Sequence, residues 1–138
     1  VLIASCLGYV EVHVEVSGTL TCYKPFNYSV HLLELDNWRD DEIDSIQNGH
    51  SGTASVNYTV SGTAIDKTVE DEVEPYVVIL HDCGGKPVCL CQQWKGVTSD
   101  MHFTLNVNLE NNELKCGQCD LHDFISFFDN LWTKITEK

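Results

Sequence analysis

The chain has 138 residues, which fits a single domain over residues 1–138, and 43% of them are hydrophobic, enough to form a buried core. Eight basic and 21 acidic residues give a formal net charge of −13. This charge excludes an ordinary nucleic-acid binder, because contacts with phosphates need a surplus of lysine and arginine, and no apolar stretch has the roughly 20 residues that cross a bilayer.

The first residues, 1–6, run from apolar to small side chains, which is typical of the end of a secretory signal. Seven cysteines and one methionine in so short a chain indicate an oxidising compartment. Two N-glycosylation sequons, at Asn27 and Asn57, agree with this interpretation. We therefore expect a secreted, extracellular glycoprotein; the alternative is an intracellular chain with seven free thiols.

The first predicted strand covers residues 10–22. Its valines alternate with glutamate and histidine over residues 10–16, the pattern of a strand with one buried face and one wet face. Ser17 and Gly18 allow a bend before Leu20 and Cys22 continue the strand, and a turn follows at residues 24–27.

The second predicted strand covers residues 30–35, where Leu33 and Leu35 fall out of phase with Val30 and Leu32. A β-bulge would shift the register by one residue and reconcile them. Residues 36–50 are polar and acidic and are interpreted as a solvated loop with a turn at its end. The alternative is a calcium site without EF-hand spacing. Its carboxylates would be those of Asp36, Asp40, Asp41, Glu42 and Asp44.

The middle of the chain predicts five more strands. They cover residues 56–60, 62–69, 75–81, 88–94 and 101–109. Residues 76–81 are apolar at every position, so this strand should be central. About seven strands with turns roughly every 8–12 residues predict a mainly β fold, an antiparallel sandwich resembling an open barrel over about residues 9–115.

The last segment changes its period. From residue 121 apolar side chains recur at i, i+3, i+4 and i+7, which predicts an amphipathic helix over about residues 120–136. Asp120 suits the first turn as a cap, and Lys134 suits the C-terminal end. We expect this helix to pack on one sheet; the alternative is an exposed helix that binds a membrane or a partner.

Four cysteines form two close pairs, Cys89 with Cys91 on a predicted strand and Cys116 with Cys119 before the predicted helix. Alternate strand positions share a face, so bridges from the first pair to the second would pin the helix to the sheet. Two disulfides are favoured over a four-thiol zinc site and over a thiol–disulfide exchange site, since no βαβ unit precedes the CxxC motif. The count is odd, so one cysteine, Cys6, is expected to be free or to bond a second chain.

No nucleophile stands with a base in any known catalytic motif, and the six histidines form no paired ligand motif. We therefore expect no enzymatic activity, no metal site and no cofactor, apart from the calcium alternative.

Several segments stand in a familiar order. They are residues 14–22, which end in Gly-Thr-Leu-Thr-Cys, then residues 24–25, 30–34, the acidic stretch 40–44, 53–62 and 74–83. Over roughly residues 9–110 this order resembles the transthyretin-like family of secreted nematode proteins, most specifically in the strands that end at Cys22 and Cys83. The resemblance implies a transthyretin-type β-sandwich and a disulfide between these two cysteines. The sequence allows that bond independently, because both cysteines end predicted strands.

The resemblance also implies a function. One branch of the family is similar to an extracellular bridging factor that recognises phosphatidylserine on apoptotic cells and presents them to a phagocyte receptor. A secreted adaptor that promotes engulfment is therefore expected, although the helix and the paired cysteines extend beyond the family pattern. The alternatives are a secreted carrier of a small apolar ligand and a CxxC thiol–disulfide or zinc protein.

The resemblance supplies no binding residues, so a lipid site is predicted from charge. The head group of phosphatidylserine is negative, and an acidic protein needs a focal basic site to bind it. The predicted site is the end of the sandwich where Cys22 and Cys83 would meet, and the alternative is a set of ordinary surface lysines. The predicted contact residues are Lys24, Lys86, Lys95, Phe26 and Trp94. Assembly into homo-oligomers would raise the affinity through avidity.

Overall fold

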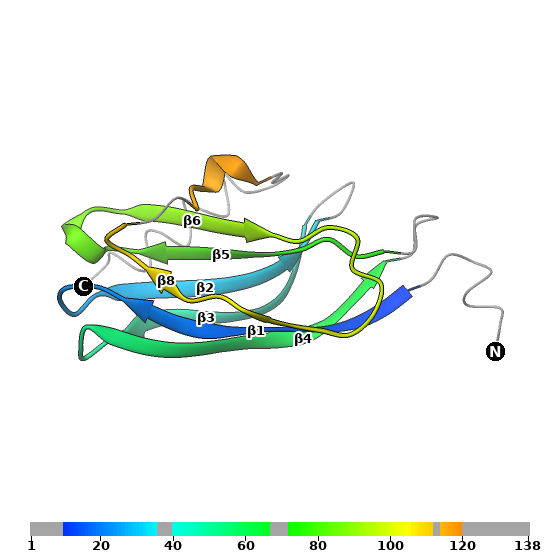
Figure 1. The fold of residues 1–138 in the computed structure, drawn as a ribbon, viewed down its shortest axis with the longest axis horizontal. Helices are drawn as coiled ribbons and strands as arrows, with labels where there is room; N and C mark the ends of the chain where they lie inside the picture. The colour runs from blue at the N-terminus through cyan, green and yellow to red at the C-terminus, as the bar shows by residue number, and fades with distance from the viewer. Residues whose placement is uncertain (1–9, 36–39, 67–71, 112–113, 120–138) are drawn as a thin grey trace.

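A computed structural model describes residues 10–35, 40–66, 72–111 and 114–119, which form eight strands in two sheets (Figure 1). The first sheet has the order β4–β1–β7, and β8 also pairs with β1. Its strands are β1 (Val10–Thr21), β4 (Ser55–Asp66), β7 (Met101–Thr104) and β8 (Val107–Asn108). The second sheet has the order β3–β2–β5–β6. Its strands are β2 (Asn27–Glu34), β3 (Asp41–His50), β5 (Pro75–His81) and β6 (Val88–Gln93).

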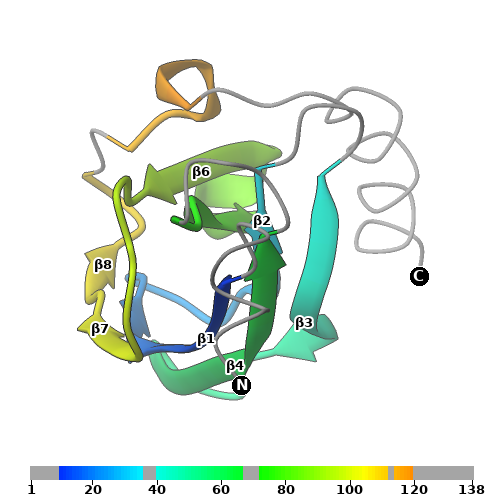
Figure 2. The same ribbon diagram turned by 90° about the vertical axis from the view of Figure 1, so that its right-hand side faces the viewer.

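The predicted mainly β fold is confirmed, but it is not purely antiparallel, since β7 and β8 pair with β1 in parallel. Seen from one end, the two sheets face each other and enclose the core (Figure 2). The alternating valines of β1 point inward, and Val12, Val14 and Val16 are buried against residues of the opposite sheet such as Leu32 and Ile79. The alternation with a period of two therefore predicts correctly which side chains of β1 enter the core.

The two central strands of the second sheet, β2 and β5, are buried on both faces. Every residue of β5 is buried, which confirms that this strand is central. An outer apolar cluster includes Leu33, Tyr76, Val78 and Leu80, with Leu35 packed against it. Leu33 and Leu35 are thus out of phase because they belong to this outer cluster and not to the inner core.

The predicted bulge exists, but it lies on the neighbouring strand. Leu32 pairs with Asp44 and Leu33 pairs with Glu42, so Ile43 is the extra residue and β2 itself alternates regularly. The sequence pattern placed the irregularity on the wrong strand because the two buried faces of β2 imitate a shift in register.

The interpretation of residues 41–50 as a solvated loop is wrong, because they form the edge strand β3. Pairing with β2 satisfies the backbone of β3, while most of its side chains keep contact with water. Ile43 and Ile46 supply its contacts with the core. An edge strand of this kind carries little of the apolar alternation by which a strand is recognised.

Residues 56–69 and 101–109 also divide differently from the prediction. The strand expected over residues 56–60 and the described part of the strand expected over residues 62–69 form the single strand β4. The strand expected over residues 101–109 is split into β7 and β8. The split occurs where the backbone N–H of Thr19 donates to Asn106 Oδ1 at 3.0 Å, so that a side chain replaces a backbone partner in the ladder.

Gly18 does not bend β1, which is continuous through it. A Cβ at this position would collide with the carbonyl oxygen of Leu105. The same oxygen accepts a hydrogen bond from the hydroxyl of Tyr58 at 2.7 Å. A tyrosine hydroxyl is protonated at physiological pH and can donate, and burial raises the pKa of Tyr58 further. Gly18 is therefore the residue that lets the segment between β7 and β8 approach β1.

The predicted helix over residues 120–136 and the odd cysteine Cys6 lie outside the described residues. Among the residues that are described, no helix is long and apolar enough to cross a membrane.

Substitution of Gly18→Ala is expected to lower the free energy of unfolding by about 2 kcal/mol, because the new methyl group meets a backbone carbonyl and not a flexible side chain. Urea denaturation measures the loss. Gly52→Ala is the control, since a Cβ there has nothing within 4 Å, and it should change stability by less than about 0.5 kcal/mol. Equal stability of the two variants would contradict the close approach.

Candidate functional site

One end of the sandwich is held together by the disulfide between Cys22 and Cys83, whose Cα atoms are 6.0 Å apart. Cys22 follows β1 of the first sheet, and Cys83 lies in the 3₁₀ turn η1 (Cys83–Gly85) that follows β5 of the second. This bond, implied by the family resemblance, is thus confirmed, and it ties the two sheets together at this end. We call this the disulfide end.

Hydrogen bonds between Asn27 and Asp82 reinforce the link between the two loops. The backbone N–H and the side-chain amide of Asn27 donate to the two carboxylate oxygens of Asp82, at 2.7 and 2.9 Å. The backbone N–H of Asp82 donates in return to the carbonyl of Asn27 at 3.2 Å. The loop after Cys22 and the loop around Cys83 therefore have a fixed relative position.

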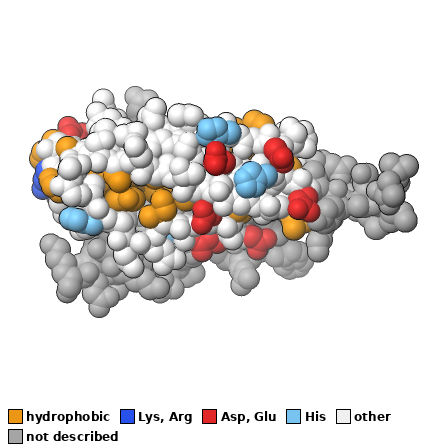
Figure 3. Space-filling model, turned by 90° about the horizontal axis from the view of Figure 1, so that it is seen from below, with side chains coloured by type: hydrophobic (Ala, Val, Ile, Leu, Met, Phe, Trp, Pro, Cys, Tyr) orange, Lys and Arg blue, Asp and Glu red, His pale blue; other side chains and the backbone are white. Residues whose placement is uncertain are grey.

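Two of the predicted lysines lie at this end. Lys24 and Lys86 are exposed, one in each of the two linked loops. In the view onto the outer face of the first sheet, lysine is visible at the tip that corresponds to this end, while most of the visible carboxylates lie toward the other end (Figure 3). The structure thus brings Lys24 and Lys86 to one end, as the sequence predicted.

The placement of Lys95 and Trp94 with these lysines is wrong. Both follow β6, at the opposite end of the sandwich, and the backbone N–H of Trp94 donates to the carbonyl of Pro75 at 2.9 Å. The length of β6, roughly 17 Å, separates them from the loop of Lys86. The ring of Trp94 stacks on Phe103 with centroids 4.3 Å apart, so it serves packing between β6 and β7.

The aromatic residue of the disulfide end is Tyr23 and not Phe26. Phe26 is 2% exposed and belongs to the core, so it cannot contact a ligand outside, whereas Tyr23 is 62% exposed. The Nζ atom of Lys24 lies 5.4 Å from the centroid of the Tyr23 ring. The alternation that turns Cys22 inward would have identified Tyr23 as the outward neighbour.

The other two disulfides join Cys89 to Cys116 and Cys91 to Cys119, with Cα separations of 5.5 and 6.2 Å. This confirms the predicted pairing between the two motifs. It attaches the 3₁₀ turn η2 (Cys116–Gln118) to the outer side of β6, as Figure 1 shows. All four sulfurs are consumed by these bonds, so they present neither a dithiol for exchange nor thiolates for zinc.

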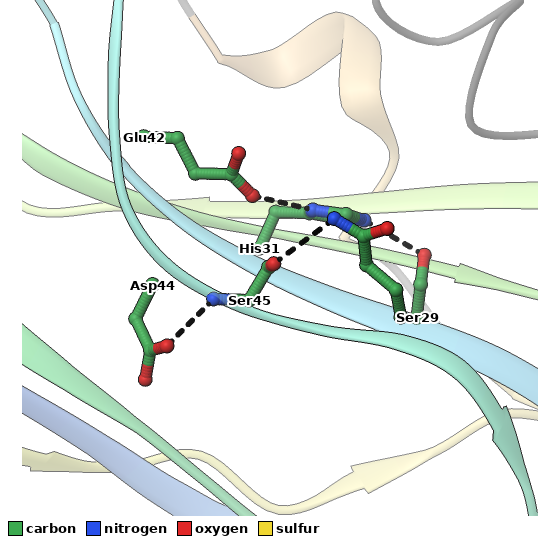
Figure 4. Close-up of polar contacts among 6 residues, drawn as sticks. Ser29, His31, Glu42, Asp44 and Ser45 are labelled. Carbon is green, nitrogen blue, oxygen red and sulfur yellow. Dashed lines mark hydrogen bonds and ion pairs between the residues drawn. The ribbon is translucent and has the colours of Figure 1, made fainter.

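A second cluster of polar side chains lies on the outer side of β2 and β3 (Figure 4). His31 Nε2 is 2.8 Å from Ser29 Oγ, and His31 Nδ1 is 3.1 Å from Glu42 Oε1. A hydroxyl, an imidazole and a carboxylate in this order have the geometry of an activated nucleophile.

Burial prevents this cluster from acting on a substrate. Ser29 is 1% exposed and His31 is fully buried, so no carbonyl carbon can approach the hydroxyl. Burial also lowers the pKa of His31, although the hydrogen bond and the charge of Glu42 act to raise it. The cluster therefore serves to tie the edge strand β3 to β2.

Three of the acidic residues proposed for calcium have other partners: Asp40 accepts from the hydroxyl of Tyr76, Glu42 contacts His31, and Asp44 links two strands. The carboxylate of Asp44 accepts the backbone N–H groups of Ser45 and Ser61, both at 2.9 Å, and so links β3 to β4. Asp36 lies outside the described residues. Within the described part of the chain, no group of three or more histidine, cysteine or acidic side chains could hold a metal ion.

No protein-family model matches the chain, and a comparison with curated proteins also finds no match. The geometry of the disulfide end is therefore the basis on which a function can be proposed.

His81 lies at the end of β5 and is fully buried beside Cys83. Its Nδ1 accepts the backbone N–H of Cys83 at 3.1 Å. Burial lowers the pKa of His81 from 6.5 to about 4, against the opposing effect of the charge on Asp82. Protonation of Nδ1 would also remove the acceptor for Cys83.

The native protein is therefore expected to lose stability as the pH falls from about 6.5 toward 4. The unfolded chain takes up a proton on His81 near pH 6.5 and the native chain does not, so the loss accumulates between these values and reaches about 3 kcal/mol. Urea denaturation across this range measures it. His81→Asn should reduce the pH dependence and the exposed control His13→Gln should not; an unchanged slope in His81→Asn would contradict the assignment.

The two sequons are expected to differ in glycosylation. The side-chain amide nitrogen of Asn27 donates to Asp82, and its oxygen accepts from His50 Nδ1 at 2.7 Å, whereas Asn57 is exposed on β4. A glycan on Asn27 would displace the link to Asp82. Deglycosylation of protein secreted from a eukaryotic host is expected to lower its mass by one glycan. The Asn57→Gln variant should show no change in mass on the same treatment. A glycan found on Asn27 would contradict this.

Proposed function

We propose that this chain is a secreted extracellular adaptor that binds phosphatidylserine exposed on apoptotic cells and a phagocyte receptor, and so promotes engulfment. We also propose that its sandwich is of the transthyretin-like type. The observation that carries the lipid proposal is the fixed pair of exposed lysines, Lys24 and Lys86, at the disulfide end. The choice of phosphatidylserine as the target comes from the family resemblance.

The chemistry of the disulfide end suits an anionic head group. Two lysine ammonium groups, on loops joined by a disulfide and by the Asn27–Asp82 hydrogen bonds, meet phosphate without first having to be assembled. Asp82 lies at the same end, but its carboxylate already accepts two N–H groups from Asn27. Its charge is thus partly compensated, and the lysines dominate the outermost surface of these two loops.

The strength of such a site is modest. A lysine close to an anionic membrane contributes about 1 kcal/mol, so two lysines alone give weak binding. Stable attachment would then come from several copies acting together, and a homo-oligomer is part of the proposal for that reason.

The alternatives receive less support from the structure. A carrier of a small apolar ligand needs space between the sheets, and there the inner faces pack against each other in one apolar cluster. A thiol–disulfide or zinc protein needs free thiols, and both members of the CxxC motif are bonded to β6.

The double variant Lys24→Glu, Lys86→Glu is expected to weaken binding to vesicles that contain phosphatidylserine by at least about 30-fold, because about 2 kcal/mol of attraction becomes repulsion. Sedimentation with vesicles, with and without calcium and against phosphatidylcholine alone, measures the effect. Lys95→Glu is the matched control at the opposite end and should bind like the parent.

Two results would count against the proposal. Equal binding by the double variant and the parent would show that the lysines are not the site. A parent protein that ignores phosphatidylserine vesicles in both conditions would remove the lipid proposal itself.

A further inference from the structure

Tyr23 is unusual among the described residues because it is large, partly apolar and mostly exposed. It is 62% exposed, compared with 43% for Ile65 and 36% for Met101, the other large exposed hydrophobic residues of the described part. A single exposed aromatic residue is common on protein surfaces and needs further evidence before it is assigned a role. Two features distinguish Tyr23 from such residues: the rigidity of the loop that carries its ring, and the lysines beside it.

The loop that carries Tyr23 is fixed on both sides. Before it, Cys22 is buried in the disulfide, and its backbone N–H donates to the carbonyl of Ala54 at 2.9 Å. After it, the buried Phe26 donates its backbone N–H to Ser51 Oγ at 3.0 Å. Only three residues, 23–25, lie exposed between these anchors, so little conformational entropy is lost when the ring is held against a surface.

The surroundings of the ring combine positive charge with little steric obstruction. Lys24 Nζ lies 5.4 Å from the ring centroid, and Lys86 lies on the linked loop. In that second loop Gly84 and Gly85 are exposed, have positive φ, and would have no atom within 4 Å of an added Cβ. A flat surface can therefore approach both loops together.

We propose that Tyr23 is the interfacial anchor of this protein, inserted between the head groups of an anionic lipid bilayer while Lys24 and Lys86 contact the phosphates. This inference rests on the proposed lipid-binding function. A tyrosine suits the bilayer interface because its ring is apolar and its hydroxyl stays at the level of the head groups. The lysine stems can lie along the same apolar boundary with their ammonium groups in the polar layer.

This geometry also defines an orientation. The loops of Tyr23 and Lys86 lie at the ends of β1 and β5, so the strands stand steeply on the membrane. The opposite end then faces away from the bilayer. Its described carboxylates include those of Glu11, Glu34, Asp40, Asp41, Glu72 and Glu74.

The test compares Tyr23→Ala, Tyr23→Phe and the control Ile65→Ala in binding to vesicles of phosphatidylserine and phosphatidylcholine. We expect Tyr23→Ala to weaken binding about tenfold, with Tyr23→Phe and Ile65→Ala close to the parent. The loss should persist at raised salt, unlike the loss caused by the lysine substitutions, because it is apolar in origin.

A second measurement reports insertion directly. Tyr23→Trp, compared with the parent, which has three tryptophans of its own, should add fluorescence that shifts to shorter wavelength on vesicles and is quenched by brominated lipids. A parent that binds while Tyr23→Ala binds equally well, or a Tyr23→Trp signal that does not respond to lipid, would overturn the anchor and leave the proposed function standing. A parent that does not bind would overturn both.

Discussion

The disulfide between Cys22 and Cys83 is the constraint on which the remaining structure depends. It joins positions 61 residues apart and connects the end of β1 in one sheet to the end of β5 in the other. On a chain-entropy model, closing a loop of this length stabilises the fold by about 4 kcal/mol. Its effect on position is as important as its effect on stability. Because both cysteines are buried, the residues that follow them must turn outward at the same end, and the exposed lysines and Tyr23 occupy those outward positions.

The two sheets differ in what they leave open to a partner. The first sheet has one solvent-exposed face, as the alternation in β1 predicts. The central strands of the second sheet, β2 and β5, are buried on both faces, and two disulfides hold η2 against the outer side of its edge strand β6. Side chains with reactive chemistry, such as Ser29 and His31, lie in this covered layer and serve to join strands. The side chains that are both exposed and carried by rigidly held loops therefore lie at the ends of the strands. This arrangement favours binding by loops over catalysis on the face of a sheet.

Much of the fold could be predicted because its signals are local. The alternation in β1, the continuous apolar run in β5 and the spacing of the paired cysteines each depend on neighbouring residues alone. The errors arose where the structure of a segment depended on contacts with strands that are distant in the sequence. β3 was not recognised because an edge strand needs few apolar residues, and the bulge was assigned to β2 because burial on both faces resembles a register shift. At the site, the lysine pair follows from the disulfide. Phe26 was predicted as an aromatic contact in place of Tyr23, although the inward orientation of Cys22 makes its neighbour Tyr23 the outward residue.

A net charge of −13 would at first argue against any anionic target, and the arrangement of charges removes this objection. The strand β1 alone extends over roughly 36 Å, whereas the Debye length at physiological ionic strength is about 8 Å. With the disulfide end on the membrane, the carboxylates at the opposite end are several Debye lengths away and their repulsion is screened. Lys24 and Lys86 lie within one Debye length, together with the exposed Glu110 and with Asp82, whose carboxylate already accepts two N–H groups from Asn27. In the reverse orientation the carboxylates of the opposite end approach the surface first and are repelled. The acidic composition is therefore compatible with attachment through the disulfide end and disfavours attachment through the opposite end, which an adaptor can use for a second binding surface.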